Sequence, residues 1–132
     1  MSFVLPSSSA AYARVGIETG VQSADAHKLV LMLFDGALVA IGQASAAMKA
    51  GNVALKGEFV SKAIQIVEEG LKASLDDKAG GKAGAELADK LRALYDYITQ
   101  RMLFASMRMQ PAGLEEALRL LRQLRDAWEQ IR

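Results

Sequence analysis

The sequence contains no cysteine and a single histidine. Without cysteine, the chain can form neither a disulfide framework nor a thiolate-ligated metal site. One histidine cannot build a carboxylate–histidine di-metal centre, because such a centre takes a Glu-x-x-His pair from each of two helices. As a general base, His27 would need an orienting partner and a substrate pocket, and the sequence indicates neither. We therefore expect a protein that is not an enzyme, with no metal and no cofactor, and we interpret His27 as a surface residue in the first turn of a helix.

The sequence also lacks a strong net charge, a secretion signal and a long apolar run. Its 16 lysines and arginines are balanced by 15 aspartates and glutamates, so nothing indicates a nucleic-acid footprint or a polybasic membrane anchor. Residues 1–13 have neither a basic segment nor a long apolar stretch, which argues against a signal peptide. The most apolar segment, Leu29–Ile41, contains Asp35 and is too short to cross a bilayer. We expect a cytoplasmic protein that binds no nucleic acid and does not insert into membranes.

Apolar residues, in contrast, are abundant. They make up 52% of the sequence when tyrosine is counted and glycine is not. If the 3 tyrosines are left out and the 11 glycines are included, the share is about 58%. An average globular chain, counted in the second way, has roughly 45–50%. A single domain of this size tends to leave part of such a surplus at its surface, where it usually serves a binding partner.

Four long amphipathic patterns follow an irregular start. Residues 1–22 contain Pro6, three consecutive serines and two glycines, and we interpret them as a mobile arm or short capping helix. Four helices are predicted: from Ser23 or Asp25 to about Ala50, from about Val53 to Asp76, from Lys82 or Ala83 to Met109, and from about Leu114 to Ile131. The breaks between them are Gly51, Gly80-Gly81 and Pro111–Gly113. Residues 23–132 are therefore predicted to form an all-α, antiparallel, up-down-up-down four-helix bundle.

The first predicted helix carries two apolar stripes. One consists mostly of small residues that permit close helix approach: Leu29, Leu33, Gly36, Ala37, Ala40, Ala44 and Ala47. The other contains larger residues: Val30, Phe34, Leu38, Ile41 and Met48. Because polar residues are sparse on this helix, either the second stripe lines a groove or the N-terminal arm covers it. In the third helix, Met102, Met107 and Met109 fit either a plastic binding surface or core packing.

Short motifs occur in a fixed order along nearly the whole chain, from about residue 12 to residue 130. Residues 23–37 read SADAHKLVLMLFDGA. Further along stand Lys62-Ala63, Ser74-Leu75-Asp76, Gly80-Gly81, Leu87-Ala88, Leu91, Leu94-Tyr95-x-Tyr97, Arg101 and Leu124-Arg125-Asp126-Ala127-Trp128, with Tyr12 in the N-terminal region. Together these motifs resemble the flagellin-specific secretion chaperones, the FliS family. Its first-helix signature reads roughly T-A-S-P-x-x-L-I-x-M-L-Y-D-G-A and its C-terminal one L-R-E-A-W.

The resemblance implies a cytoplasmic export chaperone for type III secretion in bacterial flagellum assembly. Proteins of this family are helical bundles that bind the disordered C-terminal segment of flagellin and prevent its premature polymerisation. The segment wraps around the bundle and folds on binding. The loaded chaperone then docks to FlhA, the membrane export gate. In the family, the N-terminal arm is thought to occupy the groove when it is empty and to move when cargo binds.

Seven residues are the candidate site. We expect Leu33, Phe34, Ala37 and Leu38 of the first helix, with Tyr95 and Tyr97 of the third, to be groove or groove-supporting positions. Core packing is the alternative for each, and it is favoured for Leu33 and Ala37. Tyr12 is the candidate for the switchable arm and the export-gate contact.

Some residues depart from the family pattern. Phe34 stands where tyrosine is usual, and Ala26 replaces a proline at the first helical position, which weakens the helix start. Ser106 and Gln110 stand where asparagine and aspartate are frequent, so the turn before the fourth helix is expected to differ.

Two other functions remain open. A histidine phosphotransfer domain is also a four-helix bundle of this size, but it needs an exposed mid-helix histidine, typically followed by x-x-Lys-Gly. His27 is instead followed by Lys28-Leu29-Val30. A structural dimerisation bundle would form a stable homodimer with no affinity for flagellin. Whether the chaperone itself forms a homodimer when free of cargo is also open.

Overall fold

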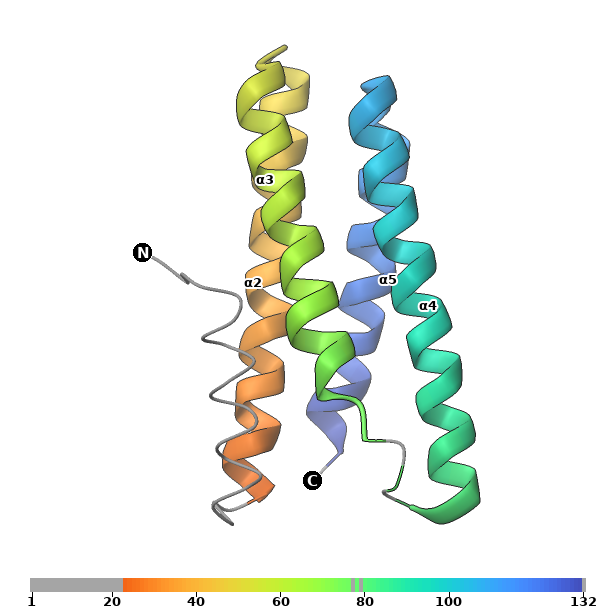
Figure 1. Cartoon of the computed structure of the whole chain (residues 1–132). Helices are drawn as coiled ribbons and strands as arrows, with labels where there is room; N and C mark the ends of the chain where they lie inside the picture. The colour runs from red at the N-terminus through yellow and green to blue at the C-terminus, as the bar shows by residue number, and fades with distance from the viewer. Residues whose placement is uncertain (1–22, 77, 79, 132) are drawn as a thin grey trace.

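The computed structural model describes residues 23–76, 78 and 80–131. Its helices are α2 (Ser23–Lys49), α3 (Val53–Gln65), α4 (Gly81–Arg108) and α5 (Pro111–Gln130). The second of these continues beyond Gln65 through a π-helical segment, η1 (Ile66–Leu71), and a 3₁₀ turn, η2 (Lys72–Ser74). Successive helices run in opposite directions (Figure 1), and no strand occurs in the part of the chain described. The predicted all-α, antiparallel four-helix bundle is confirmed. Residues 1–22, predicted to form an arm, lie outside the described residues.

The turn between α2 and α3 forms where the sequence predicts it. Gly51 has a φ of 74°, a left-handed conformation that glycine adopts without steric cost. Its amide donates to the carbonyl of Met48 (3.0 Å) and that of Asn52 to the carbonyl of Ala47 (2.9 Å), the pattern of a Schellman cap. The Asn52 side chain then accepts from the amide of Leu55 (3.1 Å) and caps the start of α3. Two adjacent residues therefore end one helix and begin the next.

The turn between α4 and α5 is shorter than predicted. We expected Pro111–Gly113 to separate the helices, but α5 begins at Pro111 itself. Proline is well suited to a first helical position, because the N–H that it lacks would have no partner there. Met109 takes the left-handed conformation (φ 52°) and the amide of Gln110 donates to the carbonyl of Ala105 (2.9 Å). The chain thus reverses over two residues.

The second helix is less regular than predicted. A single helix was expected as far as Asp76, but regular α-helical winding ends at Gln65. Within the π-helical segment that follows, the amide of Lys72 donates to the carbonyl of Val67, five residues earlier. The hydroxyl of Ser74 donates to the carbonyl of Gly70 (2.6 Å) and competes with backbone amides for that acceptor. The periodicity of the side chains continues through this segment, which is why the sequence pattern did not reveal the change.

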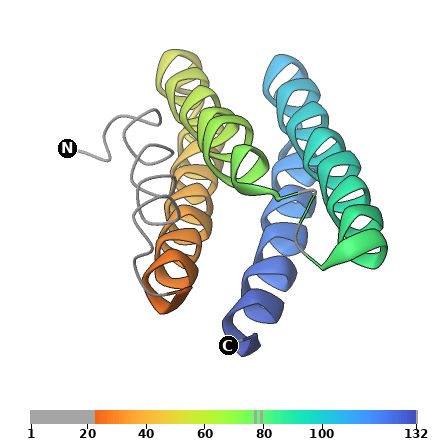
Figure 2. The same cartoon turned by 60° about the horizontal axis from the view of Figure 1, so that its bottom comes forward.

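The core is centred on α2. This helix packs against α3, η1 and α5, whereas α4 packs against α5 and the α3–η1–η2 segment. Figure 2 shows α2 and α4 on opposite sides of the molecule, with α3 and α5 between them. The four alanines of the small-residue stripe of α2 are buried. The buried core includes Leu33, Phe34, Ala37, Ala40, Ile41, Ala44, Val60, Ile66, Val67, Ile98, Met102, Leu114 and Leu121.

Of the described helices, α2 alone is long and apolar enough to cross a membrane, with a mean hydropathy of 1.7 over Asp25–Lys49. In the bundle, apolar side chains of α2 pack against other helices. Its alanine stripe is buried against neighbouring helices, together with Leu33, Phe34, Ile41 and Met48. The apolar composition of α2 is therefore that of a bundle core helix.

Gly113 provides a test of this packing. A Cβ at this position would lie 2.6 Å from the Cβ of Ala105 and 3.1 Å from the carbonyl oxygen of Arg101. Gly113→Ala is expected to lower the free energy of unfolding by about 1–2 kcal/mol, because overpacking outweighs the better helix propensity of alanine. Urea denaturation followed by circular dichroism measures this change.

Gly42→Ala is the matched control. Gly42 lies inside α2, and a Cβ there would meet nothing within 4 Å. The same substitution is therefore expected to raise the free energy of unfolding by up to about 1 kcal/mol. Equal effects at the two positions would contradict the close approach of α5 to α4 at Gly113.

Candidate functional site: an exposed apolar surface on α4

The structure separates the predicted site residues by burial. Leu33, Phe34, Ala37 and Tyr95 are buried in the core, Leu38 is half-buried, and Tyr97 is exposed. Burial raises the pKa of the Tyr95 hydroxyl to about 12, since the charged form would lose its hydration. Phe34, Ile41 and Met48 of the second α2 stripe are buried as well, so they line no open groove in this structure. Contact between the buried candidates and cargo stays a prediction, and Tyr12 lies outside the described residues.

The largest cluster of exposed apolar side chains lies on α4. Tyr97, Leu103, Phe104 and Met107 have exposed fractions between 41% and 68%. Tyr97, Phe104 and Met107 follow one another at helical spacing on the side of α4 opposite its buried residues, and Leu103 lies at the edge of that side. We call these four residues the α4 surface. Folded monomers seldom leave neighbouring large apolar side chains in water without a binding role.

Other exposed apolar side chains are more scattered. Met32 and Val39 lie two turns apart on α2, Leu55 lies at the start of α3, and Leu87 lies at the amino end of α4. Single exposed residues of this kind are common and need no functional explanation. The α4 surface differs because three of its members fall within five consecutive residues.

Arginines border the α4 surface. The guanidinium of Arg108 lies 5.2 Å from the ring centroid of Phe104, within the range of a cation–π interaction. Arg101 pairs with Glu116 of α5, and Arg119 is close enough to influence the ionisation of Tyr97 and Glu116. Three cations and one carboxylate therefore surround the two aromatic rings, and this border favours a partner that carries acidic groups.

Tyr97 joins the α4 surface to α5. Its hydroxyl donates a hydrogen bond to the carboxylate of Glu116 (2.7 Å). This bond, followed by that from Arg101, lowers the pKa of Glu116, and the same carboxylate raises the pKa of Tyr97. The link holds the Tyr97 ring in place over the α4–α5 contact.

His27 has a structural role that the sequence did not reveal. Our interpretation of it as a surface residue was wrong, because the side chain is half-buried and its ring stacks on Trp128 (centroids 4.9 Å apart, interplanar angle 14°). The Nε2 atom of His27 lies 2.6 Å from the carbonyl oxygen of Trp128, and the indole N–H of Trp128 donates to the carbonyl of His27 (2.9 Å). These contacts fasten the start of α2 to the end of α5.

The described residues offer no metal site, since no group of three or more histidine, cysteine, aspartate or glutamate side chains is placed to hold an ion. The candidate site is therefore the exposed α4 surface. Sequence reasoning named Tyr97 and Met107 but missed Leu103 and Phe104. The sequence does indicate that Leu103 and Phe104 are exposed, because both fall outside the predicted apolar stripe of the same helix. That stripe consists of Leu87, Leu91, Leu94, Ile98, Met102 and Ala105.

The Tyr97–Glu116 contact leads to a prediction about pH. Because the pKa of Glu116 is lower in the folded state than its ordinary value of 4.5, the contact stabilises the fold at neutral pH. That contribution is lost as the pH falls below 4.5 and through the folded-state pKa. Tyr97→Phe is expected to raise the pKa of Glu116 part of the way to its ordinary value, which an NMR titration of the carboxyl carbons measures.

Tyr95→Phe is the control, because the hydroxyl of Tyr95 is buried away from Glu116 and its removal should leave that pKa unchanged. An unchanged pKa in the Tyr97→Phe variant would show that the hydrogen bond does not control Glu116.

Comparison with known proteins identifies the family. The family model described as "Flagellar protein FliS" matches residues 8–132. The flagellar secretion chaperone FliS of Salmonella typhimurium is 46% identical over 121 residues, which cover 92% of this chain and 87% of that protein. The corresponding chaperones of Escherichia coli and Bacillus subtilis are 43% and 30% identical, over 91% and 86% of this chain and 85% and 80% of their own lengths. The motif-based resemblance is confirmed, and the chain belongs to the FliS family of flagellar secretion chaperones.

Proposed function

We propose that this export chaperone binds the disordered C-terminal segment of flagellin in the cytoplasm, prevents its premature polymerisation and delivers it to the flagellar export gate. Membership of the FliS family supports the coarser role, that of an export chaperone in flagellar assembly. The observation that carries the finer proposal is the α4 surface, where large apolar side chains remain exposed on an otherwise well-packed bundle. That surface suits a partner segment that becomes helical when it binds.

The chemistry of the α4 surface matches such a segment. Tyr97, Phe104 and Met107 repeat at the spacing of a helix face, so they can pack against apolar residues repeated every three or four positions on a second helix. Met107 is flexible and adapts to irregular partners. Arg108 and Arg119 can pair with acidic residues at the border of that helix. Affinity from many modest contacts leaves the complex reversible, as export requires.

Binding should depend on the α4 surface. Replacement of Leu103, Phe104 and Met107 by serine is expected to weaken the affinity for the last ~50 residues of flagellin from the same organism by about tenfold or more. The melting temperature should change by only a few degrees, because all three side chains are exposed. Calorimetric titration measures the affinity, and a negative heat-capacity change on binding of the unmodified protein would indicate apolar burial.

Leu87→Ser is the matched control. Leu87 is an exposed leucine of α4, nearly three turns before Tyr97, and its replacement should leave the affinity unchanged. Equal affinities of the triple variant and the unmodified chain would reject the α4 surface as the docking site. No binding by the unmodified chain would reject flagellin as cargo.

The alternatives give different outcomes. A structural dimerisation bundle would cover the α4 surface with a second copy, and light scattering would then detect a homodimer that does not bind flagellin. A phosphotransfer domain needs a free histidine, whereas the ring of His27 is stacked on Trp128 and its Nε2 faces a carbonyl oxygen. These contacts count against phosphotransfer at His27.

The family resemblance also leads us to propose FlhA as the export gate component that receives the loaded chaperone, with Tyr12 as the contact. Tyr12→Ala is expected to weaken binding of the cargo–chaperone complex to the cytoplasmic part of FlhA, because an amphipathic aromatic side chain is a common interface anchor. Surface plasmon resonance with immobilised FlhA measures this binding. Unchanged binding of both cargo and FlhA would remove Tyr12 from the proposed site.

A further inference from the structure

Polar side chains bridge the contact between α4 and the α3–η1–η2 segment, and we call this contact the seam. Three side-chain interactions cross it, joining Lys56 to Ser106, Glu68 to Thr99 and Lys72 to Asp96. Polar pairs also join α4 to α5 and α2 to α5, but the two buried polar residues of the described chain, Lys56 and Ser106, both lie at the seam. The seam therefore differs in chemistry from the rest of the bundle.

One end of the seam holds a buried cation. Lys56 is only 6% exposed, and its ammonium group donates to the carbonyl (2.8 Å) and the hydroxyl (3.1 Å) of Ser106. No carboxylate forms an ion pair with this ammonium group among the residues described. The carbonyl of Ser106 belongs to the last turn of α4, where the helix dipole favours a positive charge. If the seam opened, water would form hydrogen bonds with both Lys56 and Ser106, so the net loss of hydrogen-bond energy would be small.

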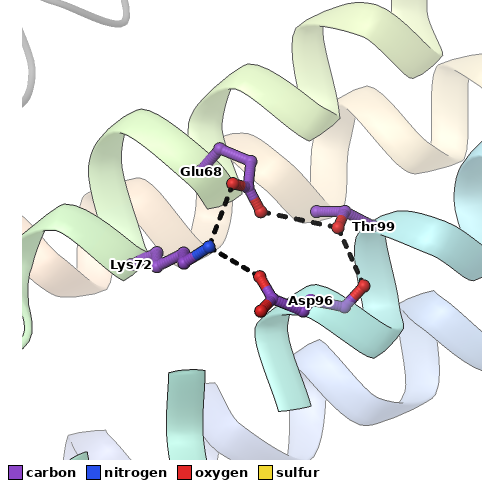
Figure 3. A network of polar contacts seen from close by, with 4 residues as sticks. All are labelled: Glu68, Lys72, Asp96 and Thr99. Carbon is purple, nitrogen blue, oxygen red and sulfur yellow. Dashed lines mark hydrogen bonds and ion pairs between the residues drawn. The ribbon is translucent and has the colours of Figure 1, made fainter. Parts of the chain in front are cut away.

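The other end is a partly exposed network (Figure 3). The ammonium group of Lys72 lies between the carboxylates of Glu68 (3.3 Å) and Asp96 (2.7 Å). The hydroxyl of Thr99 lies 2.9 Å from the backbone carbonyl of Asp96 and 3.5 Å from the carboxylate of Glu68. Solvent reaches all three charged side chains, and water replaces ion pairs of this kind at small cost.

The backbone is irregular at the same place. The residues that supply Glu68 and Lys72 belong to η1 and η2, where the α-helical hydrogen bonding gives way to π and 3₁₀ patterns. Such changes of winding within a helix are frequent at functional sites. Gly70 of η1 packs against Leu33 of α2, so this segment stays anchored to α2 on its other side.

We propose that the seam is a latch that opens when the cargo binds. In the open state α4 moves away from α3 and η1, and its buried side chains Tyr95, Ile98 and Met102 become available to the apolar face of the cargo segment. Exposure of these three side chains in water is unfavourable, and the apolar face of the cargo offsets it by covering them. The contacts of α2 with α3 and α5 stay closed, because their separation would expose further apolar surface that the cargo does not cover. This inference rests on the proposed function. Opening of the seam would bring Tyr95, which is buried in the closed state, into contact with the cargo.

A reversible cross-link tests the latch directly. Because the chain has no cysteine, Glu68→Cys with Thr99→Cys supplies one pair of thiols across the seam. These are joined by a short bis-methanethiosulfonate reagent that dithiothreitol removes. The linked protein is expected to bind the flagellin C-terminal segment at least tenfold more weakly than the same protein after release. Equal affinity before and after release would overturn the latch.

The matched control is Asp35→Cys with Arg125→Cys. These residues form an ion pair between α2 and α5, a contact that stays closed in the proposal. Linking this pair should leave the affinity unchanged. Loss of binding in both linked proteins would show that binding requires general flexibility of the bundle and would overturn the latch. If neither the unmodified chain nor any protein released from its cross-link binds the flagellin segment, the proposed function is rejected, and the latch with it.

Lys56→Met tests the buried end of the seam without a reagent. The apolar side chain fills a similar space without a buried charge, and Ser106→Ala in the same protein removes the hydroxyl that would otherwise lose its partner, so the melting temperature is expected to rise by a few degrees. Because the seam then closes more firmly, binding of the flagellin segment is expected to weaken about fivefold or more. Lys90→Met, at an exposed lysine of α4, is the control and should change neither quantity. A higher melting temperature with unchanged affinity would show that Lys56 is only structural and would overturn its part in the latch.

Discussion

The bundle depends on the close approach that the alanines of α2 allow. Ala37, Ala40, Ala44 and Ala47 are buried, and their small size brings neighbouring helices near the α2 backbone. Because α3 and α5 both pack on this helix, most of the apolar core lies around α2, and Ile98 and Met102 of α4 complete it. Burial of that surface contributes roughly 25 cal/mol per Å², and nothing in water compensates for its exposure. Any motion that the function needs must therefore occur elsewhere in the bundle.

That constraint singles out α4. It lies on the side of the bundle away from α2 and packs against α5 and the irregular second helical segment. An ordinary surface helix turns its apolar side chains inward and its polar ones outward. In its second half α4 departs from this pattern on two sides, with Phe104 and Met107 facing solvent and Ser106 meeting the buried Lys56. The helix that packs least against α2 thus carries both the exposed apolar surface and the polar seam.

Local signals explain which features could be predicted from the sequence. The helical repeats, Gly51 and Asn52 act over a few residues, so the bundle and its first turn were predictable. The start of α5 at Pro111 was missed because proline both ends and begins helices. The stacking of His27 on Trp128 joins positions 101 residues apart, a pairing that no local pattern contains. The candidate site was only partly predictable, because core packing and groove lining both require apolar residues at the same helical spacing.

A chaperone for export has to hold its cargo and then let it go, and the two parts of α4 divide these tasks. The exposed side chains contribute affinity by burying apolar surface against the cargo. In the proposed latch, the polar groups of the seam form hydrogen bonds in both states. They bond to one another when the seam is closed and to water when it is open. The free-energy difference between these states then comes mainly from the exposure of Tyr95, Ile98 and Met102, and the cargo shifts the equilibrium by covering these side chains in the open state. A seam of tightly packed leucines would make the closed bundle more stable, but the cargo would have to overcome that gain before it could bind.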